Sequence, residues 1–249
     1  TMLAKKVEPA ADGFVVEAPT AGGHNAPPRG RGQLTEEGEP LYGERDEVDL
    51  DKIARLGLPF WLAGGAGRKG RLQMALEAGA TGIQVGTLFA YCDEAGTSES
   101  LKRRVIRQSL LGQVKIKTDG RASPTGFPFK VVELPHSISE QETYEQRTRV
   151  CDLGYLRTAY RTDKGGINYR CPAEPVETYV KKGGREEDTV GRKCLCNALM
   201  SNLDRGQLRN GGAPEKPLLT SGDDLEILGS FLNGRTSYTA ADVLDYLLS

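Results

Sequence analysis

Residues 59–67 read Pro-Phe-Trp-Leu-Ala-Gly-Gly-Ala-Gly, a short apolar run that ends in three glycines. The run has the length and composition of a buried strand, and the glycines end it. Apolar residues then recur at helical spacing over residues 72–78, and Gly79 ends that pattern. A strand followed at once by an amphipathic helix is typical of a βαβ unit, so this stretch predicts a parallel sheet.

The same alternation extends in both directions along the chain. Strands are predicted at residues 14–18 and 81–85, and amphipathic helices at residues 48–56 and 101–111. Residues 2–11 have the pattern of the end of a helix. These units are fewer than the eight of a complete barrel, which takes about 250 residues. We therefore expect an α/β fold that is one part of a larger barrel, in a chain cut from something longer.

The βα rhythm stops after Gln113. Beyond it we expect a strand at residues 131–134, and two helices with start signals of the form S/T-x-x-D at residues 221–224 and 239–242. The predicted organisation is a partial barrel over residues 1–130 and a loop-rich, mainly helical, Cys-containing extension over residues 131–249.

Composition excludes several classes of protein. Lys plus Arg is 33 and Asp plus Glu is 34, giving a net charge of −1, and aromatic residues make up 6% with one Trp. Neither value fits a nucleic-acid-binding surface. The longest stretch without a charged residue, 78–92, is too short for a membrane span. The first residues lack the pattern of a signal peptide, so a cytoplasmic location is expected by default.

Each predicted strand of the first part ends in a glycine cluster, at residues 21–24, 63–67 and 84–87. In parallel α/β folds ligands bind at the carboxyl ends of strands, where glycines let backbone N–H groups approach a phosphate. The alternative is that these glycines only make tight turns. Three clusters in register favour a phosphate-bearing cofactor.

Three motifs carry a resemblance to a known family. Residues 16–24 (Val-Glu-Ala-Pro-Thr-Ala-Gly-Gly-His), 62–65 (Leu-Ala-Gly-Gly) and 84–89 (Gln-Val-Gly-Thr-Leu-Phe) resemble the second half of nitronate monooxygenases, formerly called 2-nitropropane dioxygenases. The resemblance spans residues 4–130. It implies the C-terminal portion of an FMN-dependent (β/α)8 TIM barrel. The same superfamily includes flavin-dependent enoyl-ACP reductases.

The resemblance also implies site residues. His24 matches the histidine proposed to take the α-proton of a nitroalkane or to orient the nitronate, a task that suits an imidazole because its pKa is near 6.5. Residues 123–128 take the place of a family loop near the active site, or form a turn. The implied FMN-binding residues are Gly22, Gly23, Ala63, Gly64, Gly65, Gln84, Val85, Gly86 and Thr87.

The function expected from the resemblance is the oxidation of nitronates or nitroalkanes, with a small-molecule substrate and O2 as partners. An enoyl-ACP reductase-like enzyme that uses NAD(P)H is the alternative within the superfamily. Homo-oligomer formation also stays open.

Four cysteines lie close together in the second part of the chain: Cys151, Cys171, Cys194 and Cys196. They suggest an all-thiolate site for Zn²⁺ or an iron–sulfur cluster. Tight C-x₂-C pairs are absent, however, and residues two apart on a helix do not face each other, so buried structural thiols are the alternative. A third functional hypothesis follows, in which this extension is a metal-binding interaction module on a catalytically silent half-barrel.

Overall fold

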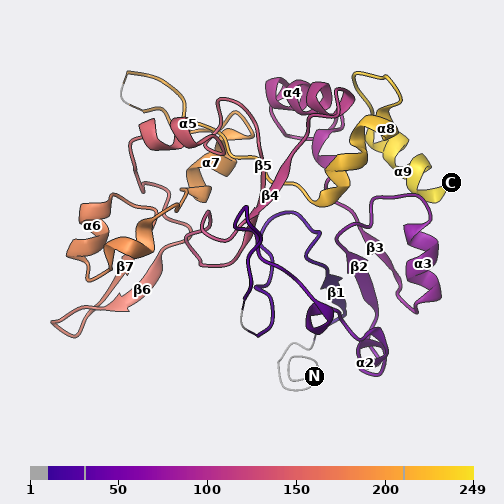
Figure 1. Cartoon of the computed structure of the whole chain (residues 1–249), viewed down its shortest axis with the longest axis horizontal. Helices are drawn as coiled ribbons and strands as arrows, with labels where there is room; N and C mark the ends of the chain where they lie inside the picture. The colour runs from indigo at the N-terminus through magenta and orange to yellow at the C-terminus, as the bar shows by residue number, and fades with distance from the viewer. Residues whose placement is uncertain (1–10, 31, 210) are drawn as a thin grey trace.

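The computed structural model describes residues 11–30, 32–209 and 211–249. Of the helix end predicted at residues 2–11, residues 2–10 lie outside the described residues. The first part of the chain is built on a three-stranded parallel sheet in the order β1-β2-β3, with β1 Phe14–Glu17, β2 Phe60–Ala63 and β3 Gly82–Gln84 (Figure 1). Glu17 pairs with Ala63, and Ala63 with Gln84. The three strands therefore end level, and the loops that follow them meet at one edge of the sheet.

Helices connect these strands as the periodicity predicts. They are α2 Leu50–Ala54, α3 Arg71–Glu77 and α4 Glu99–Leu110. Side chains at helical spacing on α4 are buried, among them Leu101 and Val105, whereas Arg103 and Arg107 are exposed. The predicted alternation of strands and helices in residues 14–111 is thus confirmed.

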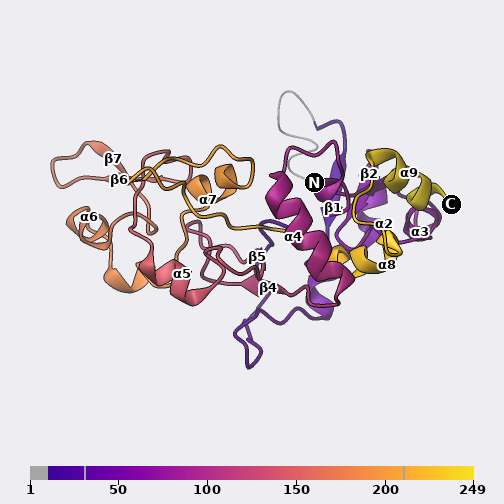
Figure 2. The same ribbon diagram turned by 90° about the horizontal axis from the view of Figure 1, so that it is seen from above.

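The end of the chain returns to this sheet. The 3-10 helix η4 Asp223–Ile227, α8 Leu228–Leu232 and α9 Ala240–Leu248 lie beside α3 and α4 in both views (Figures 1 and 2). Leu228 and Leu232 share the largest apolar core of the molecule with Leu88, Leu101 and Val105. A side chain at Gly229 would clash with the Ser109 carbonyl, so α8 packs backbone to backbone against α4.

The two predicted helix starts in this segment differ in outcome. Thr239 caps α9 as expected, since its hydroxyl accepts from the Asp242 N–H while the Asp242 carboxylate accepts from the Thr239 N–H. The start at Ser221 is wrong: η4 begins after Gly222 with no side-chain cap. The Ser221 hydroxyl instead lies 2.6 Å from the hydroxyl of Tyr91.

The middle of the chain forms a second lobe with little regular structure (Figure 2). It contains the antiparallel pairs β4 Ile116–Asp119 with β5 Phe129–Val132 and β6 Thr158–Arg161 with β7 Ile167–Arg170. The helices are α5 Gln141–Gln146, α6 Val176–Lys181 and α7 Leu195–Ser201, and the remaining 3-10 turns are η1 Glu44–Asp46, η2 Phe89–Tyr91 and η3 Glu186–Thr189. The domain division at residue 130 stays a prediction; in space, residues 219–249 lie with the first part (Figure 1).

A buried ion network ties the second lobe together. The Arg147 guanidinium donates to both carboxylate oxygens of Glu215, at 2.6 and 2.9 Å, and Arg209 bridges Glu215 to Asp152. The Glu215 side chain is 2% exposed and that of Arg147 is 8% exposed. Burial raises the pKa of Glu215, but the two arginines outweigh it and hold the pKa below its usual value.

We expect Glu215→Ala to lower the free energy of unfolding by about 3–5 kcal/mol, because it leaves Arg147 buried without a counter-charge. Urea denaturation measures this. Arg185→Ala is the matched control, since the Arg185 side chain is 71% exposed and exposed ion pairs contribute little to stability. The wild-type contribution is present above the unfolded pKa of about 4.3 and is lost as the pH falls below it. Equal midpoints for the two variants would contradict the prediction.

Candidate functional site

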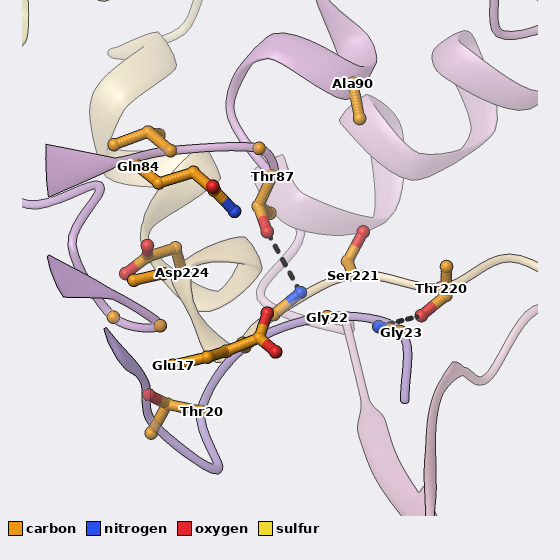
Figure 3. A pocket seen from close by; sticks show the side chains of 17 residues that line it. Glu17, Thr20, Gly22, Gly23, Gln84, Thr87, Ala90, Thr220, Ser221 and Asp224 are labelled. Atoms are coloured by element: carbon orange, nitrogen blue, oxygen red, sulfur yellow. Dashed lines mark hydrogen bonds between the residues drawn. The ribbon is translucent and has the colours of Figure 1, made fainter. Parts of the chain in front are cut away.

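A cavity of about 270 Å³ opens at the carboxyl ends of β1, β2 and β3 (Figure 3). It lies where parallel α/β folds place their ligands. All nine residues predicted to bind a cofactor line it: Gly22, Gly23, Ala63, Gly64, Gly65, Gln84, Val85, Gly86 and Thr87. The structure thus brings together three clusters that are far apart in the sequence.

Two of these glycines are required for different reasons. Gly64 has a φ of +86°, and a Cβ there would lie 2.9 Å from the Ala18 carbonyl oxygen, so the turn itself excludes a side chain. A Cβ on Gly86 would meet no atom within 4 Å, and its φ is not positive. The backbone at Gly86 therefore tolerates a side chain, and glycine there keeps space open in the cavity.

Several backbone donors at the cavity have no acceptor. Among the described residues, none accepts a hydrogen bond from the N–H groups of Gly64, Gly65, Gly86 or Thr87. Gly64, Gly65 and Thr87 are half-buried and Gly86 is exposed. Half-buried N–H groups are normally paired with protein, water or a ligand. A set of free N–H groups after two adjacent parallel strands is suited to an anion such as a phosphate.

The far wall of the cavity comes from the loop that precedes η4. The Gly23 N–H donates to Thr220 Oγ1 at 2.7 Å, and the Gly222 N–H donates to Thr87 Oγ1 at 2.9 Å (Figure 3). A Cβ on Gly22 would lie 2.7 Å from the Gly222 nitrogen, so the two chain segments touch through their backbones. No sequence signal pointed to this wall, because the contacts join residues far apart in the chain.

Two carboxylates border the cavity. Asp224 is buried, and it accepts hydrogen bonds from the Gly67 N–H at 2.7 Å and from Arg68 Nε at 3.4 Å. Its charge is therefore used in fixing the turn after β2. Glu17 ends β1, and partial burial raises its pKa.

His24 follows Gly23 directly but does not line the cavity itself. Its ring packs edge to face on Phe129, with 4.9 Å between centroids, and its Nε2 lies 2.6 Å from Ser123 Oγ. Ser123 Oγ in turn lies 2.7 Å from Thr125 Oγ1. Partial burial lowers the pKa of His24, which favours the neutral form of the imidazole.

From sequence alone, residues 123–128 fit either a turn or a loop near the active site. In the structure, this loop supplies Ser123, which contacts the His24 ring. Strand β5 holds the two segments in register, because the Asn25 N–H donates to the Pro128 carbonyl and the Lys130 N–H to the Gly23 carbonyl, each at 2.9 Å. The Lys130 ammonium then pairs with Asp223 Oδ1 at 2.7 Å. His24 is therefore fixed beside the cavity by contacts on both sides.

The four cysteines of the second lobe gather in one small cluster. Helix α7 begins at Leu195, so Cys194 occupies the N-cap position and Cys196 the first turn. Within the described ranges, no group of three or more His, Cys, Asp or Glu side chains is already arranged as a metal site. Metal binding by Cys151, Cys171, Cys194 and Cys196 therefore stays a prediction.

Likeness to solved structures concerns the fold. The enoyl reductase domain of MlnA, from the macrolactin biosynthesis cluster of Bacillus amyloliquefaciens, gives a TM-score of 0.50 at 13% identity over 95% of this chain and 54% of that one. FabK from Thermotoga maritima gives 0.48 at 15% identity over 96% and 53%. The chain spans about half the length of these structures. A search of curated proteins found no match.

Among the described residues, no helix combines the length and apolar character needed to cross a bilayer. The cytoplasmic location and a homo-oligomer stay predictions.

The sequence model of one family matches the part of the chain that forms the sheet and the glycine-lined side of the cavity. It covers residues 2–127, just over half of the 249 residues. With the parallel sheet and the glycine-lined cavity at its carboxyl edge, this match shows that the chain belongs to the nitronate monooxygenase family and forms part of a TIM-barrel fold.

Proposed function

We propose that this chain belongs to an FMN-dependent oxidoreductase that oxidises nitronates or nitroalkanes with O2. The free N–H groups of Gly64, Gly65, Gly86 and Thr87 around one cavity carry the proposal. Family membership supports the choice of flavin.

The cavity fits the cofactor in its donors and in its open space. The four N–H groups would hold the FMN phosphate, and Gly22 and Gly23 would lie near the ring. A Cβ on Gly23, like one on Gly86, would meet no atom within 4 Å, so both positions leave room. FMN, when bound, supplies an acceptor for two electrons that O2 can reoxidise.

His24 is the candidate base. When Nε2–H donates to Ser123 Oγ, Nδ1 carries the free lone pair, and no described residue is hydrogen-bonded to Nδ1. The Ser123 hydroxyl can then donate a hydrogen bond to Thr125 Oγ1. Nδ1 would accept the α-proton of a nitroalkane, and the C–H electron pair would move to the nitro group to give the nitronate. Ser123 would hold the resulting imidazolium.

The test is a spectrum of the purified protein after incubation with FMN, followed by anaerobic mixing with an alkyl nitronate or with NADPH. Bleaching of the flavin band by the nitronate but not by NADPH supports the proposal. Bleaching by NADPH alone would select an enoyl-reductase-like enzyme in its place. A protein that binds no flavin would contradict both enzymatic hypotheses and would favour the third, in which the half-barrel is catalytically silent.

A further inference from the structure

The cysteine cluster of the second lobe has no part in the proposed flavin chemistry. Its sulfur-bearing residues come from three separate segments: Cys151 follows α5, Cys171 follows β7, and Cys194 and Cys196 begin α7. Cys171 and Cys194 are 4% and 5% exposed. All four pack in one cluster: Cys194 and Cys196 form one pair at the start of α7, and Cys151 and Cys171 form a second pair from the two preceding segments.

The cluster itself buries little apolar surface. Ala173 is the one buried member of the cluster that is not a cysteine. The adjoining β6–β7 hairpin leaves Ile167 74% and Tyr169 54% exposed, and Val180 of α6 is 44% exposed. An isolated two-stranded hairpin is marginally stable in water. Small lobes of this kind are commonly held by a metal or by disulfides.

The surroundings of the cluster are polar. Asn197 is completely buried, and its Nδ2 donates to Cys194 Sγ at 3.3 Å and to Asp152 Oδ1 at 2.7 Å. The Oδ1 atom of the same amide is buried without a hydrogen-bond partner among the described residues. Donors directed at sulfur are expected around thiolates and are unnecessary around inert thiols.

Positive charge also lies beside the cluster. The Arg157 guanidinium donates a hydrogen bond to the Cys151 carbonyl. This cation would offset part of the negative charge of a metal with several thiolate ligands.

From this convergence we propose that Cys151, Cys171, Cys194 and Cys196 bind a thiolate-held metal centre, either one Zn²⁺ or an iron–sulfur cluster, that crosslinks β7, α7 and the segment after α5. On binding, each thiol releases its proton to solvent as its sulfur bonds to the metal. A cluster would be assembled from external iron and sulfide. Within the described residues no group of three is yet in place, so on binding the side chains would turn inward onto a single ion, or each pair would bind one iron of a two-iron cluster.

The experiment is metal and acid-labile sulfide analysis of the full chain, purified anaerobically from cells grown with both zinc and iron. We expect about one zinc per chain and no sulfide, or about two irons with matching sulfide and a visible charge-transfer band. Cys171→Ser and Cys196→Ser should each lower the metal content at least tenfold. Cys92→Ser is the matched control. Cys92 is the one cysteine outside the cluster, and it is buried in the largest apolar core, with Leu88 and Leu101.

A second readout does not depend on the folding of any variant. Wild-type protein stripped with a chelator and titrated with Co²⁺ should develop the intense sulfur-to-cobalt absorption of thiolate ligation, which Zn²⁺ then displaces. Wild-type protein that holds no metal and develops no such absorption would overturn the proposal. So would equal metal loss in Cys92→Ser and Cys171→Ser, or a disulfide within either pair in the protein as isolated.

Discussion

His24→Ala is expected to lower kcat for a nitroalkane by about 10²- to 10⁴-fold, the usual contribution of a positioned general base, while flavin content is unchanged. Turnover should fall without loss of flavin because His24 contacts Ser123 and Phe129 and does not line the cavity proposed for FMN. Steady-state turnover and flavin absorbance on the same preparation measure both quantities. His136→Ala is the control, since His136 is the second of two histidines and lies exposed in a loop.

The pH profile tests the same role independently. The base must be neutral to accept a proton, so kcat/KM should be constant at neutral pH and fall as the pH drops through the His24 pKa. Burial lowers that pKa, so the fall is expected below pH 6.5. Ser123→Ala should keep flavin and lower kcat less than His24→Ala does, because it removes the partner that orients the ring. A His24→Ala enzyme with unchanged turnover would refute the assignment.

The second large effect is expected from Gly86→Val. A valine side chain would enter the cavity without striking the protein, so flavin affinity should fall at least tenfold, which corresponds to about 1.4 kcal/mol, with little change in stability. Flavin fluorescence titration and thermal unfolding measure the two effects. Gly120→Val is the matched control, because a Cβ there also meets no atom within 4 Å and Gly120 does not line the cavity.

Equal flavin affinity in Gly86→Val and wild type would place the cofactor elsewhere. Loss of both stability and flavin in Gly86→Val, with neither lost in Gly120→Val, would mean that the position is structural.

Local periodicity was enough to predict the sheet and one side of the cavity. Strand β2 is a run of apolar residues that ends in glycine, and parallel strands bring such ends to one edge, so Gly64 and Gly86 meet without any knowledge of long-range contacts. The nine predicted lining residues follow from that rule together with the family resemblance. Whether they bind FMN stays a prediction.

Features set by distant contacts were not predictable in this way. Ser221 has the sequence of a helix cap, but its hydroxyl pairs with Tyr91 across 130 positions of chain. Strand β7 alternates apolar and polar residues over only four positions, and its apolar side chains Ile167 and Tyr169 are exposed, so its pairing with β6 does not depend on a buried face. Helix α7 begins at Leu195, between Cys194 and Cys196, so the rule that residues two apart on a helix do not face each other does not apply to this pair.

The bond between Gly23 and Thr220 has a consequence for the order of folding. It joins residues 197 positions apart, and the Gly222 and Thr87 pair spans 135 positions. Contacts of such separation cost the most loop-closure entropy and form late. During synthesis, the glycine turns of the first lobe leave the ribosome well before the segment that walls them in. The nascent chain should therefore complete this pocket only after residues 220–222 have emerged from the ribosome, once the second lobe has had time to fold.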